Sequence, residues 1–182
     1  MSHLSTELIN QGKCARRENR LAVAHMYFVN AVALCRRTGT QRELAEALKG
    51  LGQIERDTGD DEAARLLYEE AVAICRVEDD PLALAHTVRH LGDIHQEAGR
   101  VELAERCYRE ALAIYGGRDD APALDLANAI RSLAMLKDDT GQIAEATRLW
   151  EEARDLYKAA GVREGVTECS RSLARLSREQ MR

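Results

Sequence analysis

A phrase of twenty-five residues returns at a nearly fixed interval along the chain, and this repetition constrains the fold more than any other feature. Residues 91–115 read LGDIHQEAGRVELAERCYREALAIY, and related phrases begin forty residues earlier at Leu51 and forty-two residues later at Leu133. A weaker copy around Gly12 and Phe28 opens the chain. A period of about 20–50 residues is typical of solenoids, in which each unit buries its apolar face against its neighbours.

Each copy holds two helical patterns joined by a turn that contains Gly59, Gly99 or Gly141. Glycine at this place permits the positive φ with which a helix ends in a tight turn. Alanine, leucine, glutamate and arginine, which are good helix formers, are the commonest residues. The sequence therefore predicts an all-α solenoid of four helix-turn-helix repeats followed by a C-terminal capping helix.

We expect a single domain over residues 1–182, with repeats at about 4–37, 41–76, 80–116 and 121–160 and a capping helix over 162–180. Aspartate pairs stand at predicted helix ends or turns, where we expect them to act as caps, at 60–61, 79–80, 119–120 and 138–139. Two of these pairs precede Pro81 and Pro122, and proline is tolerated in the first turn of a helix. The capping helix carries an apolar stripe that can cover repeat four while its polar face meets water.

Aromatic residues occupy equivalent positions in the second helix of all four repeats, at Phe28, Tyr68, Tyr108 and Trp150. Side chains that recur at one position of every repeat are expected to fill the space between neighbouring repeats. Most of the few aromatic residues are therefore predicted to be scaffold, and we expect no cofactor.

The repeated residues resemble the motif of the tetratricopeptide repeat family. Repeat three matches it through Leu91, Gly92, Gly99, Ala104, Tyr108 and Ala111. The period of forty to forty-two residues is similar to that of the longer subclass found in kinesin light chains and in bacterial peptide-sensing regulators. The resemblance covers nearly the whole chain. It implies a right-handed α-α superhelix that binds a protein or peptide on the concave face, which the first helix of each repeat lines, and it implies no catalysis.

Composition and charge argue against several other classes of protein. The net charge of −5 is unlike the basic excess of a general nucleic-acid binder. The sequence has no run of about 18 apolar residues, so we expect no membrane span. Its five cysteines form no C-x-x-C pair, which favours reduced thiols in a cytoplasmic protein. The absence of a glycine-rich phosphate loop and of a nucleophile with a nearby base indicates that the protein is not an enzyme.

His86 and His90 lie one helical turn apart, a spacing at which two histidines can hold zinc. The glutamate of an H-E-x-x-H motif is missing, and no cysteine stands near them in the sequence. We therefore interpret them as surface or partner-contacting residues and expect no metal site.

A basic ladder is predicted in the concave groove, because four successive repeats place a cation at one position of the first helix, at Lys49, Arg89, Arg131 and Arg171. Arginine forks pair well with carboxylates, so the ladder suits an acidic peptide segment or the C-terminal carboxylate of a partner. The arrangement is similar to the carboxylate clamp of chaperone-binding repeat proteins, although the asparagines of that clamp are not reproduced. The predicted groove residues are Lys49, Gln53, Arg56, His86, Arg89, His90, Asp93, Asn128, Arg131, Met135, Arg171 and Arg175.

The alternative to a peptide-binding ladder is that these cations pair with acidic residues of neighbouring helices. The candidate partners are Glu46, Asp57, Glu97 and Asp139. Surface charges on solenoid helices often do no more than pair and solvate. Both interpretations stay open on the sequence alone.

The second helix of repeat one is unusually apolar. It carries Ala22, Met26 and Val29 at outward positions where the other repeats mostly have charged residues. An outer face that becomes apolar at one end of a solenoid is a candidate for self-association, here as a homodimer. The alternative is that residues 2–9 fold back over this face.

These observations predict a module that binds another protein or a peptide. Two other functions remain in view. One is a regulatory peptide sensor whose superhelical pitch changes on binding. The other is a structural unit that assembles through its N-terminal repeat.

Overall fold

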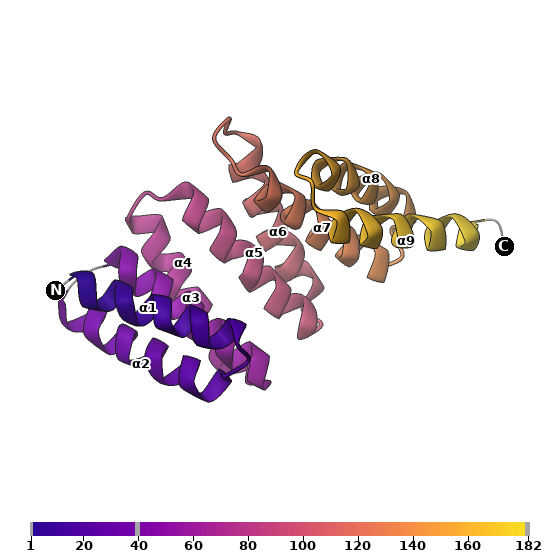
Figure 1. Ribbon diagram of the computed structural model, residues 1–182. Coiled ribbons are helices and arrows are strands. Elements are labelled where there is room, and N and C mark those ends of the chain that lie inside the picture. Colours follow the sequence, from indigo (N-terminus) through magenta and orange to yellow (C-terminus); the bar gives the residue numbers. More distant parts are fainter. Residues whose placement is uncertain (1, 39–40, 181–182) are drawn as a thin grey trace. The chain divides into compact units, whose positions relative to one another are not determined.

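The computed structural model describes residues 2–38 and 41–180, and these ranges contain nine helices and no strand, as predicted (Figure 1). The helices are α1 (Ser2–Arg17), α2 (Leu21–Thr38), α3 (Gln41–Thr58), α4 (Asp61–Val77), α5 (Pro81–Glu97), α6 (Val101–Gly116), α7 (Ala123–Asp139), α8 (Ile143–Ala159) and α9 (Arg163–Gln180). The chain divides into two compact units, Met1–Ile94 and His95–Arg182, with the division inside α5.

Short turns join the two helices of each hairpin, and the predicted glycines make them. Gly59, Gly99 and Gly141 have φ values of +89°, +68° and +74°. Asn19 takes the equivalent place between α1 and α2 with a φ of 58°. Asparagine is among the few residues that tolerate this conformation, so the weak first copy of the repeat still forms a hairpin.

Unit 1 is built around aromatic side chains that enter between its helices. The buried ring of Phe28, on α2, lies against α1 and α3 at two glycines. A Cβ atom added at Gly50 would lie 2.1 Å from the ring, and one added at Gly12 would lie 2.9 Å from it. Only glycine at these two positions lets α1 and α3 approach the ring so closely.

Unit 2 has its own core, which contains the buried side chains of Tyr108, Leu133 and Trp150. The apolar stripe of α9 packs against it, with Cys169 and Leu176 buried in the same cluster. Most of the remaining side chains of α9 are polar and exposed. This last helix therefore packs on α8 and covers part of the core of unit 2.

Aspartate caps occur at two of the four predicted pairs. Asp60 accepts a hydrogen bond from the backbone N–H of Ala63 at 3.0 Å, at the start of α4. Asp80 accepts one from the N–H of Ala83 at 3.1 Å, at the start of α5. Each satisfies one of the N–H groups that have no partner within the helix.

The capping prediction is wrong for the other two pairs. No side chain caps α7, which begins directly after Pro122. Asp120 instead forms an ion pair with Arg118 at 2.8 Å. Asp138 lies in the last turn of α7, where the helix offers carbonyl groups rather than N–H groups, and it pairs with Arg175 of α9. At both places the carboxylate pairs with an arginine side chain instead of capping a helix.

Candidate functional site

A cavity of about 380 Å³ opens among the helices of unit 1. We call it the basic cavity, and it is lined by Lys13, Arg16, Arg17, Phe28, Glu46, Lys49, Gly50, Gln53, Tyr68, His86 and His90. Four of these side chains are cationic, and Glu46 is the one carboxylate among them. The protein is acidic as a whole, so this concentration of positive charge is local.

Helical periodicity brings these side chains together. Lys49 and Gln53 lie four residues apart on α3, and His86 and His90 lie four residues apart on α5. Residues at this spacing share one face of a helix. The last turns of α1 add three cations to the same cavity, so α1, α3 and α5, the first helices of successive hairpins, all contribute to it.

Aromatic rings complete the cavity. Phe28 and Tyr68 are both buried. The Tyr68 ring stacks on His90, with ring centres 5.7 Å apart, and His86 meets His90 edge-on at 4.7 Å. The Tyr68 hydroxyl donates a long hydrogen bond of 3.5 Å to Gln53, and burial raises its pKa, so it stays protonated. The cavity thus combines cationic groups with flat apolar surfaces.

Glu46 holds two of the cations in place. Its carboxylate accepts from Lys13 Nζ at 2.5 Å and lies 2.7 Å from Lys49 Nζ. Burial alone would raise the pKa of Glu46, but the two ammonium groups outweigh it and lower the pKa to about 2. Glu46 is therefore ionised at neutral pH and fixes both lysines at the wall of the cavity.

The two arginines at the end of α1 differ in their pairing. Arg16 Nε donates to Asp57 at 2.6 Å. Arg17 is exposed and forms no hydrogen bond or ion pair with a carboxylate in the part of the protein that the structure describes. Arg17 is therefore a cation of the cavity that an added anion reaches without breaking an internal pair.

Both histidines of the cavity are kept neutral. Burial, followed by the neighbouring His90 and Lys49, lowers the pKa of His86 to about 3. Burial likewise lowers the pKa of His90, against the opposing effect of Asp93. Arg89 donates to Nε2 of His90 at 2.6 Å, which leaves the His90 proton on Nδ1, 3.4 Å from Asp93. Among the described residues, no group of three or more histidine, cysteine, aspartate or glutamate side chains is placed to hold a metal ion.

His86 has a polar atom without a partner. Its Nδ1 is buried and forms no hydrogen bond within the described residues. Buried polar atoms are satisfied in the great majority of cases, so an orphan in a cavity wall is informative. A ligand that reaches this ring could supply the missing hydrogen bond.

The predicted basic ladder is divided by the structure. Lys49 lines the basic cavity. Arg89 pairs with Asp93 at 3.0 Å on its own helix. Arg131 pairs with Glu168 at 3.1 Å. Lys49 also lies 2.7 Å from Glu46, so three of the four predicted cations are paired with internal carboxylates, as the alternative interpretation allowed.

The remaining predicted groove residues also have defined places. In unit 1, Arg56 lies 3.8 Å from Asp93 and does not line the basic cavity. In unit 2, Asn128 accepts from the Tyr157 hydroxyl at 2.7 Å, and Met135 packs against the core. Arg171 is exposed on α9, and Arg175 forms ion pairs with Asp138 and with Glu179 at 3.1 Å. Structural contacts therefore account for most of the predicted residues in unit 2.

Among the residues that line the basic cavity, Arg17 and Gly50 were not predicted, and Phe28 and Tyr68 were predicted in another role. Arg17 carries no periodic signal, because it occupies the end of a helix next to a variable turn. Gly50 stands in the middle of α3, and a glycine inside a helical pattern is the one available sign of a close approach. Phe28 and Tyr68 were interpreted as scaffold, which they are, but their rings also line the cavity.

Successive helical hairpins of this kind define a helical-repeat protein. Residues 4–76 and 82–159 match the model of the tetratricopeptide repeat family, and the chain belongs to that family. The predicted family and the predicted all-α repeat fold are thus confirmed. Tetratricopeptide repeats generally mediate interactions between proteins and generally have no catalytic activity of their own.

Solved structures of similar fold include BtubC (BKLC) from P. vanneervenii, with a TM-score of 0.78 and 19% identity over 87% of this chain. The chain spans 65% of the length of that structure. A kinesin light chain-like protein of Podosopora anserina with nearly identical TPR-like repeats has a TM-score of 0.71 and 18% identity over the full length of both chains. A variant of that protein gives a TM-score of 0.72 and 17% identity, over 100% of this chain and 99% of the variant. These identities are low, so the likeness concerns the fold.

A comparison with curated protein sequences finds no match. None of the helices within residues 2–38 and 41–180 combines the length and the apolar character that crossing a membrane requires.

Proposed function

We propose that this protein binds an acidic or carboxylate-bearing segment of a partner protein in the basic cavity of unit 1. The observation that carries the proposal is the lining of the cavity, in which four cations face one carboxylate above buried aromatic rings. Arg17 forms no hydrogen bond or ion pair with a carboxylate among the described residues, although the neighbouring Glu18 is close enough to interact with its charge, and the lysines are held in position by Glu46. A cavity of this size fits the range of small ligand sites, so one or two side chains of a partner could enter it.

The chemistry of the lining favours a carboxylate over a phosphate-rich polymer. The cations are few and confined to one cavity of a protein with a net charge of −5. Charge-assisted hydrogen bonds contribute about 1.5–3 kcal/mol each before the cost of ordering, so two or three of them support a modest affinity. The orphan Nδ1 of His86 offers one neutral hydrogen bond beside the charged ones.

Replacing Arg17 with glutamate should weaken the binding of an acidic probe by about fivefold, the effect of one partly exposed charge pair. The probe is a fluorescein-labelled peptide of glycine and glutamate with a free C-terminal carboxylate, followed by fluorescence polarisation at low ionic strength. Arg17→Glu breaks no internal ion pair, so the stability of the fold should be little affected. This variant is therefore a cleaner test than reversing Arg89 or Arg131, which both have internal partners.

Arg106→Glu is the matched control. Arg106 is exposed on α6 and lies outside the basic cavity, and its substitution changes the net charge by the same amount. The control should bind the probe as the wild type does, and an amidated probe with glutamine in place of glutamate should bind neither protein. Equal weakening by both variants would indicate a general charge effect and contradict the assignment to the basic cavity. Absence of binding to the wild type would refute the proposed function for this class of ligand.

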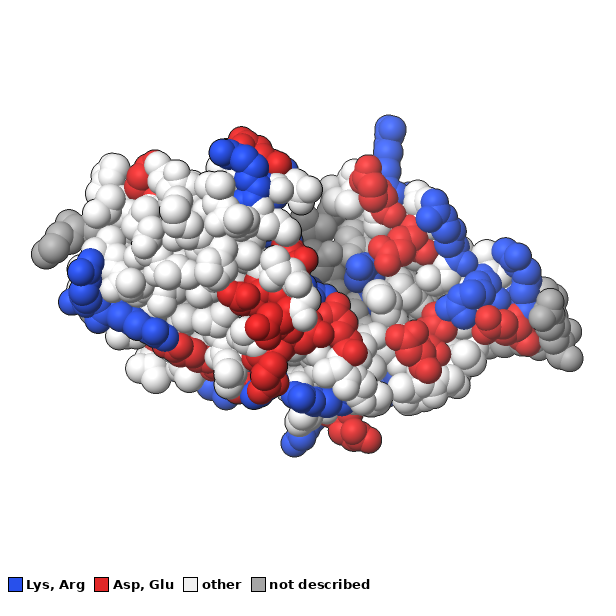
Figure 2. All heavy atoms as spheres, turned by 90° about the horizontal axis from the view of Figure 1, so that it is seen from below, with Lys and Arg blue, Asp and Glu red and all other residues white. Residues whose placement is uncertain are grey.

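The outer face of α2 supports self-association as a second candidate function. The fifteen residues 21–35 of α2 include no lysine, arginine, aspartate or glutamate. Met26 is 50% exposed and Val29 is 39% exposed. Figure 2 shows a broad field without charged side chains on the part of unit 1 that contains α2 and is seen from below. A helix that is apolar on most sides is usually covered.

The alternative cover for this face, residues 2–9, is not found there. These residues belong to α1, and the buried Ile9 packs in the core of unit 1. Met26 and Val29 remain exposed. We propose a second copy of the protein as the cover.

The double substitution Met26→Glu/Val29→Glu should convert a wild-type dimer into a monomer, because two charges would have to be buried in the interface. Sedimentation velocity at the highest soluble concentration measures the outcome. Leu124→Glu, which adds a charge at an exposed leucine of α7, is the control and should remain a dimer. A wild-type protein that sediments as a monomer would contradict the proposal.

A further inference from the structure

Unit 1 contains a second cavity, of about 300 Å³, beside the first. We call it the aliphatic cavity, and it is lined by Thr6, Ile9, Asn10, Lys13, Arg42, Glu43, Ala45, Glu46, Lys49, Ile74, Cys75, Glu78, Asp80 and Ala83. Lys13, Glu46 and Lys49 line both cavities. The ion pairs of Glu46 with the two lysines thus form a shared wall, and a peptide bound in one cavity can continue into the other.

The walls of the aliphatic cavity suit a hydrocarbon chain. Ile9, Ala45 and Cys75 are buried, and Ile74 and Ala83 are half-buried beside them. No aromatic ring lines this cavity, unlike the basic one, among the residues that the structure describes. Filling such walls with methylene groups removes apolar surface from water at about 25 cal/mol per Å².

Negative charges outnumber positive ones at the aliphatic cavity, whereas positive charges predominate at the basic cavity. The four carboxylates of the aliphatic cavity exceed its three cations. Asp80 is engaged with Arg42 at 2.5 Å and with the start of α5. Glu43 accepts from the hydroxyls of Ser5 at 2.6 Å and Thr6 at 3.0 Å, and it stands in the first turn of α3.

Glu78 is the exceptional carboxylate. It is the C-cap residue of α4, where the carbonyl end of the helix carries partial negative charge and disfavours an acid. Within the described residues it forms no ion pair or side-chain hydrogen bond, and Arg42, a cation close enough to interact with its charge, is held by Asp80. Beside it, Val77 is 83% exposed. A cation placed here would relieve the repulsion between Glu78 and the end of the helix.

We propose that the aliphatic cavity receives a lysine or arginine side chain of the same partner segment whose carboxylate enters the basic cavity. The inference rests on the proposed function and extends it. The methylene stem packs on Ile9, Ala45 and Ile74, and the cationic head reaches Glu78 at the rim. A neutral aliphatic side chain would fill the walls but leave Glu78 uncompensated, and an acidic one would be repelled. The partner segment therefore carries both charges, and they fix its direction in the groove.

Pentylamine is the probe for the aliphatic cavity, with 1-pentanol and pentanoate as its neutral and anionic isosteres. Binding is followed by backbone amide shifts of the ¹⁵N-labelled protein. We expect saturable shifts at Ala45, Ile74 and Ala83, with the amine bound about fivefold more tightly than the alcohol and pentanoate bound most weakly. In Glu78→Gln the preference for the amine should disappear while the affinity for 1-pentanol stays unchanged. Equal affinity for amine and alcohol, or shifts confined to other residues, would overturn the proposal.

Arg17→Glu separates this inference from the proposed function, because Arg17 lines only the basic cavity. It should weaken binding of the acidic peptide probe and leave pentylamine binding as in the wild type. If the acidic probe fails to bind the wild type while pentylamine binds as expected, the proposed function fails and the assignment of a cation to the aliphatic cavity stands. If only pentylamine fails to bind, the further inference alone is refuted.

Discussion

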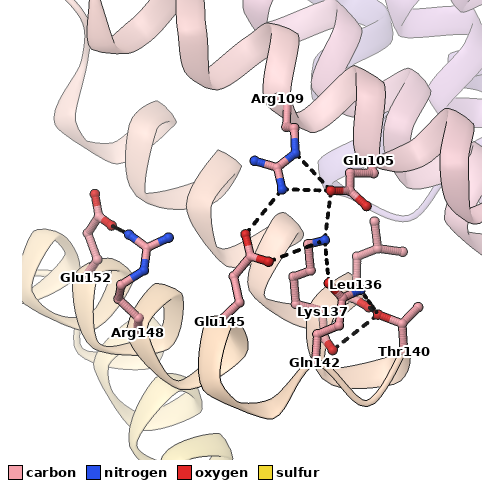
Figure 3. A network of polar contacts seen from close by, with 9 residues as sticks. All are labelled: Glu105, Arg109, Leu136, Lys137, Thr140, Gln142, Glu145, Arg148 and Glu152. Carbon is pink, nitrogen blue, oxygen red and sulfur yellow. Dashed lines mark hydrogen bonds and ion pairs between the residues drawn. The ribbon is translucent and has the colours of Figure 1, made fainter.

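Replacing Lys137 with alanine is expected to destabilise unit 2 by about 1.5–3 kcal/mol, because it removes a buried cation that donates charge-assisted hydrogen bonds to its neighbours. The side chain of Lys137 is only 3% exposed. Its Nζ lies 2.7 Å from Glu105 and 3.5 Å from Glu145, and it donates to Gln142 at 3.0 Å (Figure 3). Three acceptors surround the three donors of the ammonium group, so the charge is fully compensated where it is buried.

The network joins three helices of unit 2. Glu105 comes from α6, Lys137 from α7 and Glu145 from α8. The hydrogen bond from Lys137 is the largest cause that holds the pKa of Glu105 below its usual range. Arg109 contacts the same two acids, at 2.7 Å and 3.2 Å, but its side chain is 54% exposed. Water screens Arg109, so the two cations of the network are expected to differ sharply in their effect on stability.

Trp150 provides the measurement, because the one tryptophan of the sequence is buried in the core of unit 2. Its fluorescence during urea unfolding measures the decrease in the free energy of unfolding caused by Lys137→Ala. Arg109→Ala should cost about 1 kcal/mol or less. Lys158→Ala, at an exposed lysine of α8, should leave the midpoint unchanged. If Lys137→Ala unfolded at the urea concentration of Arg109→Ala, the buried charge would not be the main contribution of this network.

The scaffold was predictable because its determinants are short-range and repeated. A turn glycine must adopt a positive φ whatever its neighbours are, and Gly59, Gly99 and Gly141 could be recognised from their spacing alone. The aromatic positions followed from the same period. Helices and turns could be predicted because every repeat packs similar side chains at equivalent positions.

The pairing of charges was not predictable in the same way. Periodicity places Arg131 on a face of its helix, but its partner Glu168 lies 37 residues further on, and the rotamers of both decide the contact. Lys137 stands where repeats one, two and three have Ala15, Glu55 and His95, so no repeated pattern marks it as a buried ion. Arg17 belongs to the basic cavity because α1 ends beside α3, which is a property of the packing. The partners of long charged side chains therefore could not be predicted from the repeat pattern.

Acidification from pH 7 to pH 5 is expected to cost the folded protein about 2 kcal/mol through His86 alone. In the unfolded state a histidine binds a proton below its ordinary pKa of 6.5, whereas folded His86, buried among Lys49 and Arg89, does so only near 3. The unfolded state therefore binds more protons between these values, and stability falls as the pH falls through this range. The pKa of His90 is lowered as well, so its effect has the same sign.

Urea unfolding at pH 8, 7, 6 and 5, followed by the circular dichroism signal of the helices, measures this loss of stability. Stability should be nearly equal at pH 8 and 7, where His86 is neutral in the folded protein and largely neutral in the unfolded one, and should then decline. Glutamine at this position cannot take up a proton, so His86→Gln should reduce the difference between pH 7 and pH 5 by about 2 kcal/mol. Measurements above pH 4.5 largely avoid the titration of Glu46. Its pKa is lowered to about 2, so its protonation reduces stability mainly in stronger acid. An unchanged pH dependence in His86→Gln would mean that the ring accepts a proton in the folded protein, which is incompatible with its burial among the cations of the basic cavity.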